Sequence, residues 1–343
     1  GQHLTLTIPE IASPDTTGHN EVLLNVEYRL KESRPMLEAG HCVAYQQLPV
    51  KEYSAFSCTL PSSAETVEVH PSLGNLKVRA SGTEYTFNKH TGFIDRITMD
   101  GIDMLAHGHS LEPNFWRPPT DNDYGVNLQR RFSLWRDPEY QLEDLAISGS
   151  DTCRIILTRY SMNGLPGMQL SIAYNISGTG QMRVEQKLTQ ADTSADIPGF
   201  FRFGMKTVMP RRFSTICYYG KGPSESYLDR NASQLLGIYR QSVSQQYYPY
   251  IRPQETGNKT SLRWWKVTDD GGCGLCFHSD REFSASALDR MPMTLDDGPD
   301  KYIHQSHGNS VEPLHLTAVN IDGVQQGLGC IDSWKSEPRQ QYM

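Results

Sequence analysis

Alternating hydrophobic and polar positions run through most of the chain and predict β-strands. In the segment EVLLNVEYRL, residues 21–30, apolar side chains alternate with polar ones from Val22 to Tyr28. Two longer segments, YTFNKHTGFIDRITMDG (85–101) and MQLSIAYNISGTGQMRVEQKL (168–188), each contain two alternating runs joined by a turn. Because successive side chains of a strand point to opposite faces, each of these longer segments predicts a hairpin with one buried face.

Helical spacing is weak by comparison. It occurs only near RRFSLWRDPEY, residues 130–140, where Pro138 interrupts it. Short strands with a turn signal about every dozen residues are typical of antiparallel sandwiches, and no alternation of strands and helices favours a barrel or a nucleotide-binding fold. The pattern therefore predicts an all-β protein.

A change in composition divides the chain. The segment CTLPSSAETVEVHPSLGN, residues 58–75, is rich in Ser, Pro and small polar residues, which is typical of a domain boundary. We predict one domain at 1–62 and a second at 66–343. The first is too short for a complete immunoglobulin-like sandwich of about 100 residues and suggests the second half of one. The second suggests a large double-sheet domain. The chain also begins within a strand-like pattern, which suggests a fragment of a longer protein.

Charge and hydropathy exclude several classes of partner. The 343 residues carry a net charge of −7, and the 32 Lys and Arg residues form no basic cluster, which argues against nucleic acid or an anionic membrane as a partner. No apolar run approaches the roughly 20 residues that span a bilayer, and the first residues lack the features of a signal peptide. Cytoplasm and periplasm both remain open.

Cysteine and histidine spacing gives little support for a metal site. Seven cysteines form no regular framework, so free thiols are expected rather than disulfides. Cys273 and Cys276 have the spacing of half a zinc or redox site, but no second pair follows and the flanking residues favour buried strand thiols. Four loop histidines are possible metal ligands, although solvated side chains are the simpler interpretation: His107, His109, His304 and His307.

The stretch NFWRPPTDNDYG, residues 114–125, predicts a shaped loop. Its prolines at 118 and 119 exclude a helix interior and a central strand, and Gly125 permits a positive φ where the chain leaves. Between them lie three residues that cap or chelate: Asp121, Asn122 and Asp123. They either bind a cation or a sugar hydroxyl or only satisfy local amides in a rigid connector.

Two further motifs, YYGKGPSESYLDR (218–230) and YYPYIRPQETGNKTSLRWW (247–265), combine aromatic residues, prolines and opposite charges. Aromatic faces pack on sugar rings, while carboxylates and Arg forks bind hydroxyls. The alternative is that the charged residues form buried ion pairs that hold long loops on the sheets. The residues of interest are Glu225, Tyr227, Asp229, Arg230, Arg252 and Glu255.

The last motif is GLGCIDSW, in which Asp332, Ser333 and Trp334 follow Gly327 and Gly329. A Trp after a glycine-rich turn is presented at a loop tip, where its indole is able to stack on a ligand. The alternative is a Trp that packs at the edge of the domain.

Together these motifs resemble one family, the large lactose-hydrolysing β-galactosidases of glycoside hydrolase family two. EAGHCVAYQQLPV resembles the end of the immunoglobulin-like domain that precedes their last domain. FNKHTGFIDRI and the four motifs above follow in the family's order. The resemblance covers nearly the whole chain and implies a large antiparallel super-sandwich, similar in fold to aldose mutarotases.

The resemblance also implies roles for particular residues. Asp121, Asn122, Asp123 and Gly125 lead into an active-site loop, with Gly125 as the hinge and residues 126–135 as the moving part. Trp334, with Asp332 and Ser333, contacts the sugar beyond the scissile bond. We therefore expect Trp334 to be exposed in this chain when it is isolated.

The resemblance implies that both catalytic glutamates, and the ligands of magnesium and sodium, lie in domains of the family that are not part of this sequence. We therefore expect no catalytic residue, cofactor or metal in this chain, and no activity from it alone. Its expected partners are the missing barrel, the preceding domains and a galactoside, within a homo-oligomeric parent.

The chain departs from the family at its end, RQQYM, and at HQSH, residues 304–307. Two other functions remain open. One is a free-standing carbohydrate-binding module, and the other is an aldose 1-epimerase, which rests on fold analogy alone.

Overall fold

The computed structural model describes residues 3, 5, 17, 18, 20–191, 194–300, 307–329 and 337–343. The chain divides into two compact units, Gly1–Ser57 and Cys58–Met343. In the first unit, strands β1 (Val22–Arg29) and β2 (Cys42–Lys51) pair in an antiparallel hairpin. The strand predicted from the alternation at 21–30 is therefore confirmed.

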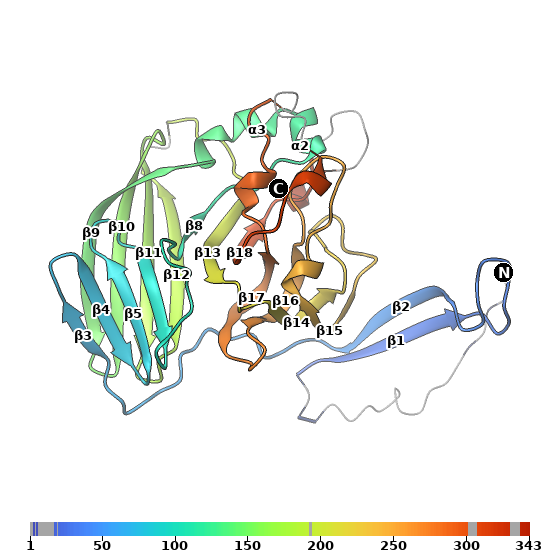
Figure 1. The fold of residues 1–343 in the computed structure, drawn as a ribbon, viewed down its shortest axis with the longest axis horizontal. Helices are drawn as coiled ribbons and strands as arrows, with labels where there is room; N and C mark the ends of the chain where they lie inside the picture. The colour runs from blue at the N-terminus through green and yellow to red at the C-terminus, as the bar shows by residue number, and fades with distance from the viewer. Residues whose placement is uncertain are drawn as a thin grey trace. The chain divides into compact units, whose positions relative to one another are not determined.

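The described strands of the second unit form three antiparallel sheets (Figure 1). The five-stranded sheet has the order β3 (Glu68–Pro71), β4 (Asn75–Ala80), β5 (Thr83–Asn88), β6 (Ile94–Met99) and β7 (Ile102–Asp103). The four-stranded sheet has the order β12 (Met182–Gln190), β11 (Met168–Ser177), β10 (Cys153–Asn163) and β9 (Glu139–Ser150). The seven-stranded sheet has the order β15 (Leu235–Ser242), β14 (Thr215–Gly222), β16 (Lys259–Thr268), β17 (Gly274–Leu288), β18 (Leu316–Gln325), β13 (Arg202–Pro210) and β8 (Glu112–Asn114).

Apolar faces of these sheets meet in a common core. The five- and four-stranded sheets lie face to face: the rings of Phe87 and Tyr174 pack edge to face at 5.1 Å, and the Tyr85 hydroxyl donates to the Gly180 carbonyl at 2.7 Å. Both hairpins predicted from the alternation are present, as β5–β6 and β11–β12. The predicted fold class, all-β with a large antiparallel sandwich, is confirmed.

Strands β13 and β18 carry the segments that form the site described below. They pair from Pro210↔Leu316 to Arg202↔Gln325. Gly204 is required in this pairing, because a Cβ there would lie 2.2 Å from the carbonyl oxygen of Ile321. The antiparallel register places the end of β18, at Gln325, beside the start of β13, at Arg202.

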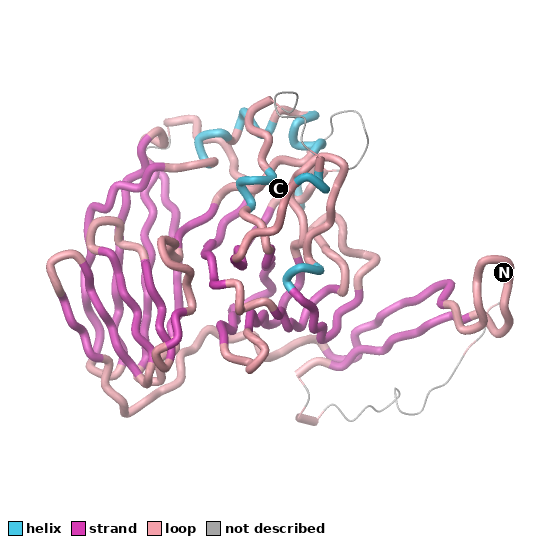
Figure 2. Tube along the Cα trace, viewed as in Figure 1, coloured by secondary structure: helices cyan, strands magenta, loops and turns pink. Residues whose placement is uncertain are grey.

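Short helical turns lie in connections between strands and near the C-terminus (Figure 2). Helices α2 (Asp121–Gly125) and α3 (Leu128–Arg131) and the 3-10 turn η1 (Ser133–Trp135) follow one another between β8 and β9. The other turns are η2 (Val243–Gln245), η3 (Pro292–Leu295), η4 (Gly308–Ser310) and η5 (Gln340–Tyr342). No described helix is long and apolar enough to cross a membrane.

The structure corrects the interpretation of residues 114–135. The prolines at 118 and 119 lie in neither a helix nor a strand, as predicted, but the residues after them form the helix α2 instead of the expected loop. Gly125 ends that helix and lacks the expected positive φ, which belongs instead to Asn127, at 65°. Residues 126–135, the predicted moving part of the active-site loop, contain two short helical elements, α3 and η1, and three buried side chains: Leu128, Phe132 and Trp135. Movement of this segment stays a prediction.

The predicted environments of the cysteine and histidine side chains are only partly confirmed. Six described cysteines are free: Cys42, Cys58, Cys153, Cys217, Cys273 and Cys276. Cys276 does lie in a strand, β17, but it is exposed rather than buried, because only one face of the sheet packs on the core there. His107 and His307 are exposed and His109 is half-buried, whereas His304 lies outside the described residues.

Candidate functional site

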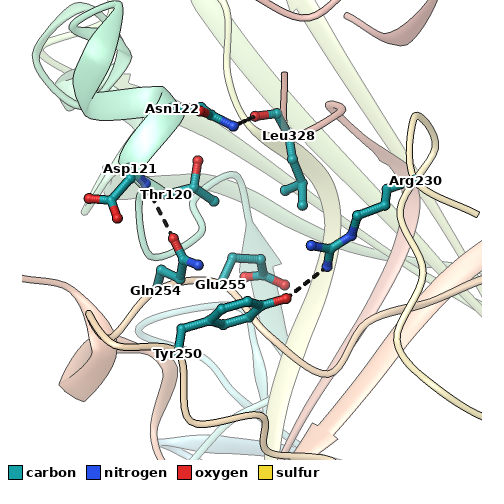
Figure 3. Close-up of a pocket in the computed structure, with 8 residues that line it drawn as sticks. All are labelled: Thr120, Asp121, Asn122, Arg230, Tyr250, Gln254, Glu255 and Leu328. Carbon is teal, nitrogen blue, oxygen red and sulfur yellow. Dashed lines mark hydrogen bonds between the residues drawn. The ribbon is translucent and has the colours of Figure 1, made fainter. Parts of the chain in front are cut away.

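Four segments that are distant in the sequence meet at a pocket of about 120 Å³ in the second unit (Figure 3). They are the start of α2, the motif at 218–230, the motif at 247–265 and the chain that leaves β18. The pocket is lined by Thr120, Asp121, Asn122, Arg230, Tyr250, Gln254, Glu255 and Leu328. Its lining therefore offers charged, amide, hydroxyl and aromatic groups within a small space.

A buried ion pair fixes the start of α2. The Arg117 guanidinium and the Asp123 carboxylate lie 2.9 Å apart, and their side chains are 0% and 1% exposed. Asp123 also accepts from the Thr120 amide at 2.8 Å, while the Thr120 hydroxyl accepts from the Asp123 amide at 3.2 Å. This reciprocal capping box satisfies amide groups that a helix end otherwise leaves unpaired.

Arg117 and Asn122 also bind carbonyl groups of the exit segment, the name we give to residues 326–329 because they follow β18. Arg117 donates to the carbonyls of Gln326 at 2.5 Å and Gly327 at 3.0 Å. The Asn122 side-chain amide donates to the Leu328 carbonyl at 3.2 Å, as Figure 3 shows. The start of α2 is thereby joined to the exit segment by three hydrogen bonds.

Asp229 binds backbone amide groups of the exit segment. Its two carboxylate oxygens accept from the amides of Leu328 and Gly329, each at 2.9 Å. A carboxylate that accepts two amide hydrogens makes charge-assisted bonds, which are stronger than bonds between neutral groups. The sequence motif at 218–230 therefore acts directly on the backbone near the C-terminus.

Glu225 organises the neighbouring wall of the pocket. It accepts from Arg230 and from the Tyr250 hydroxyl, and its other oxygen accepts from the Gly257 amide at 2.8 Å. Burial, followed by the hydrogen bond to Glu225, raises the pKa of Tyr250 to about 12. The phenol is therefore a neutral donor at physiological pH. Arg230 also lies 5.1 Å from the centre of the Tyr227 ring.

A second buried cluster of charged side chains contains Glu255, Arg202 and Asp322. Arg202 is 3.3 Å from the Glu255 carboxylate and 3.4 Å from that of Asp322, and all three side chains are at most 5% exposed. Burial raises the pKa of Asp322 to about 7, although Arg202 opposes the shift. Two carboxylates thus share one cation in a region with little water to solvate them.

Arg252 links the outer wall to the neighbouring loop. Its guanidinium lies 3.3 Å from Asp121 and 3.0 Å from Asp297. The Gln254 side chain accepts from the Asp121 amide at 3.2 Å. Asp121 itself is exposed at the pocket mouth.

Comparison with known proteins identifies the family. The family model described as "Beta galactosidase small chain" matches residues 79–343, and that described as "Beta-galactosidase, domain 4" matches residues 1–51. The chain belongs to the β-galactosidase family. It corresponds to the C-terminal region of these enzymes.

Relatives among the β-galactosidases are much longer than this chain. The enzyme of Priestia megaterium is 31% identical over 99% of this chain but only 31% of its own length. The enzyme of Lactobacillus delbrueckii subsp. bulgaricus is 28% identical over 97% of this chain and 31% of its own length. The chain thus spans about a third of these relatives. A putative aldose 1-epimerase from Escherichia coli K12 is similar at 12% identity with a TM-score of 0.34, over 75% of this chain and 98% of that chain.

The structure brings together most of the residues that the sequence predicted as a site. Asp121 and Asn122 line the pocket with Arg230 and Glu255, while Asp123 supports them from the interior. Arg230 pairs with Glu225 inside their own motif. The ion pairs of the other motif reach different segments: Arg252 pairs with Asp121 and Asp297, and Glu255 pairs with Arg202. Asp332, Ser333 and Trp334 lie outside the described residues.

Sequence reasoning missed Arg117, Arg202 and Asp322. Arg117 belongs to the stretch at 114–125, but the two prolines that follow it dominated the interpretation of that stretch. Arg202 and Asp322 are charged residues inside strand-like apolar runs, FRFG and VNIDGV. A charge at such a position is a usable signal, because burying it is costly unless a partner of opposite charge is present.

Within the described part of the chain, no group of three or more His, Cys, Asp or Glu side chains is arranged to hold a metal ion.

Proposed function

We propose that this chain is the non-catalytic C-terminal portion of a retaining β-galactosidase that hydrolyses terminal β-D-galactosides such as lactose. Its role is to supply part of the active-site rim and the contacts to the aglycone, the sugar beyond the scissile bond. The single observation that carries this proposal is the junction between the start of α2 and the exit segment. The start of α2 contains the predicted residues Asp121, Asn122 and Asp123, and the exit segment precedes the predicted residues 332–334 in the sequence.

The proposed aglycone contacts are Asp332, Ser333 and Trp334, which follow the exit segment in the sequence and lie outside the described residues. An indole and a polar pocket together suit a sugar, because a sugar presents both an apolar face and hydroxyl groups.

The chemistry itself requires groups outside this chain. Retaining hydrolysis uses an acid/base and a nucleophilic carboxylate about 5–5.5 Å apart, and we assign both to the catalytic barrel of the parent enzyme. Magnesium and sodium belong to the same missing part. The barrel, the preceding domains and the galactoside are therefore the proposed partners, in a homo-oligomeric parent without nucleic-acid or membrane contacts.

A free-standing carbohydrate-binding module is the alternative that the polar pocket favours. It predicts measurable sugar binding by the chain alone. The aldose 1-epimerase alternative requires a His and a Glu that converge on a sugar, but none of the described residues lining the pocket is a histidine.

The experiment is an assay of the purified 343-residue chain and of the full-length parent enzyme on a chromogenic galactoside. We expect turnover from the parent and none above the buffer rate from the chain. Calorimetric titration of the chain with galactose and lactose should give no saturable binding. Turnover by the chain that survives repurification would contradict the proposal, and tight sugar binding would favour the carbohydrate-binding module.

A further inference from the structure

Cys276 and His278 lie side by side on an exposed face of β17. Because they alternate along the strand, both side chains point to the same face, whereas Leu275 and Phe277 point the other way and pack against the core. The Cys276 sulfur and the Nε2 atom of the His278 ring are 3.2 Å apart. A thiol and an imidazole nitrogen are thus held in contact on a strand that pairs with β16.

This pairing differs from the one that the CGLC motif suggests. Cys273 precedes β17, which begins at Gly274, and its backbone amide donates to the Asp269 carboxylate at 2.9 Å. Cys273 and Cys276 are both free thiols. The partner of Cys276 is instead the histidine two residues further along the strand, so the adjacent ligand groups are a thiol and an imidazole.

The separation of the two atoms suits a tetrahedral metal ion. Zinc binds a thiolate sulfur at about 2.3 Å and an imidazole nitrogen at about 2.0–2.1 Å, which places two such ligand atoms about 3.5 Å apart at a tetrahedral angle. The 3.2 Å between the Cys276 sulfur and the His278 nitrogen is close to that value. A divalent ion that binds here takes the place of the thiol proton, which is released to solvent.

The surroundings of the pair are open to water, since Cys276 and His278 are both exposed. On β16, Lys266 lies opposite Cys276 and Trp264 opposite His278, and the Lys266 ammonium lies 5.1 Å from the centre of the Trp264 ring. Asp280, the next residue on this face, is paired with Arg281. Among the described residues no third His, Cys, Asp or Glu side chain completes a metal-binding group, so water must fill the remaining coordination positions.

We propose that Cys276 and His278 form an open, two-ligand site for a thiophilic cation such as Zn²⁺. Thiolate and imidazole are ligands that Zn²⁺ prefers, whereas magnesium and calcium take oxygen ligands. Because only two protein groups bind the ion and water reaches it, binding is reversible and in the micromolar range. This inference does not depend on the proposed function.

The test is the protection of individual thiols from alkylation by Zn²⁺ in the reduced 343-residue chain. Mass spectrometry of the resulting peptides follows each cysteine separately, with and without micromolar ZnCl₂. We expect Zn²⁺ to slow alkylation of Cys276 selectively, and Mg²⁺ to protect no thiol. His278→Gln should weaken zinc binding at least roughly ten-fold, since loss of a group that only orients a metal ligand already costs about 10–100-fold in affinity.

Cobalt binding adds a second readout with matched controls. A thiolate bound to Co²⁺ gives charge-transfer absorption in the near ultraviolet, which Cys276→Ser should abolish. Cys273→Ser removes the other thiol of CGLC, and His70→Ala removes an exposed histidine that is bonded to Glu68 at 3.0 Å. Both controls should leave the absorption and the protection of Cys276 unchanged. Urea denaturation checks that the variants remain folded, as expected for exposed positions.

Two results would overturn the inference directly. One is the absence of zinc protection at Cys276, and the other is protection that is as strong in His278→Gln as in the unmodified chain, because the thiol then binds zinc without the imidazole. Loss of protection in Cys273→Ser would assign the ion to the CGLC pair and would also contradict the inference. None of these results bears on galactoside hydrolysis, so failure of the zinc site is distinct from failure of the proposed function.

Discussion

The Arg117 guanidinium and the Asp123 carboxylate form an ion pair at 2.9 Å in the interior, with both side chains essentially inaccessible to water. Arg117 extends this pair to the exit segment, where it binds the carbonyls of Gln326 and Gly327. One arginine thus connects the start of α2 to the exit segment. Its ring contact with Phe201, 4.7 Å from the centroid, keeps the guanidinium in place.

Removal of Arg117 should strongly destabilise the chain. Arg117→Met leaves the Asp123 carboxylate buried without its cation, which typically costs about 3–5 kcal/mol. Urea denaturation measures the free energy of unfolding. Arg96→Met is the control, because Arg96 and Asp103 form a pair whose side chains are about half exposed and which should contribute less than about 1 kcal/mol. Equal losses for the two variants would show that burial of the Arg117 pair has no energetic consequence.

Asp322 should make stability depend on pH in the acid-to-neutral range. Its pKa is about 7 in the folded chain against a usual 3.8. The folded state therefore binds the proton of Asp322 more tightly than the unfolded state does. The resulting contribution to stability is fully present below about pH 4 and is lost as the pH rises through 7. The full effect is on the order of 4 kcal/mol.

Asp322→Asn tests this directly. The variant keeps Arg202 paired with Glu255 and removes the titrating group. In the unmodified chain the free energy of unfolding should be higher at pH 5 than at pH 8. This difference should be smaller in Asp322→Asn. Asp103→Asn, at the surface, should preserve the original difference. A profile that is identical with and without Asp322 would rule out its titration as the cause.

Trp135 should anchor the segment between α2 and β9. Its side chain is 1% exposed, its indole N–H donates to the Pro198 carbonyl at 2.8 Å, and its ring packs 4.8 Å from Phe115. Trp135→Ala is expected to lower the free energy of unfolding by about 3–5 kcal/mol. It should also accelerate amide exchange over residues 128–135.

The adjacent Leu134 provides the comparison, since it is 45% exposed. Leu134→Ala should change stability by less than about 1 kcal/mol. If the two substitutions accelerate exchange equally, the segment is not held by Trp135.

The sequence predicts the strands well because strand periodicity is local. The alternation at 85–101 and 168–188 contains the information that forms β5–β6 and β11–β12, and no distant contact is needed to recognise it. The helix at Asp121–Gly125 was missed for a physical reason. It is a single short turn created by the Thr120–Asp123 capping box and the Arg117 pair, and five residues carry too little periodicity to indicate a helix.

The site was predictable as a set of motifs but not as a geometry. Asp229 lies 99 residues from the Leu328 amide that it binds, and Arg117 lies 210 residues from the Gly327 carbonyl. One sequence contains no pattern that relates such positions. The partner of Glu255 was similarly hidden, because Arg202 comes from β13 rather than from the motif that contains Glu255.

The central claim is that this chain supplies aglycone contacts to a β-galactosidase, and kinetics of Trp334→Ala in the full-length parent enzyme test it most directly. Stacking of a sugar ring on an indole contributes on the order of 1–2 kcal/mol, and 1.4 kcal/mol corresponds to roughly ten-fold in affinity. We predict that KM for lactose rises roughly ten-fold while KM for an activated aryl galactoside changes much less. An unchanged KM for lactose in a folded, active variant would contradict the account.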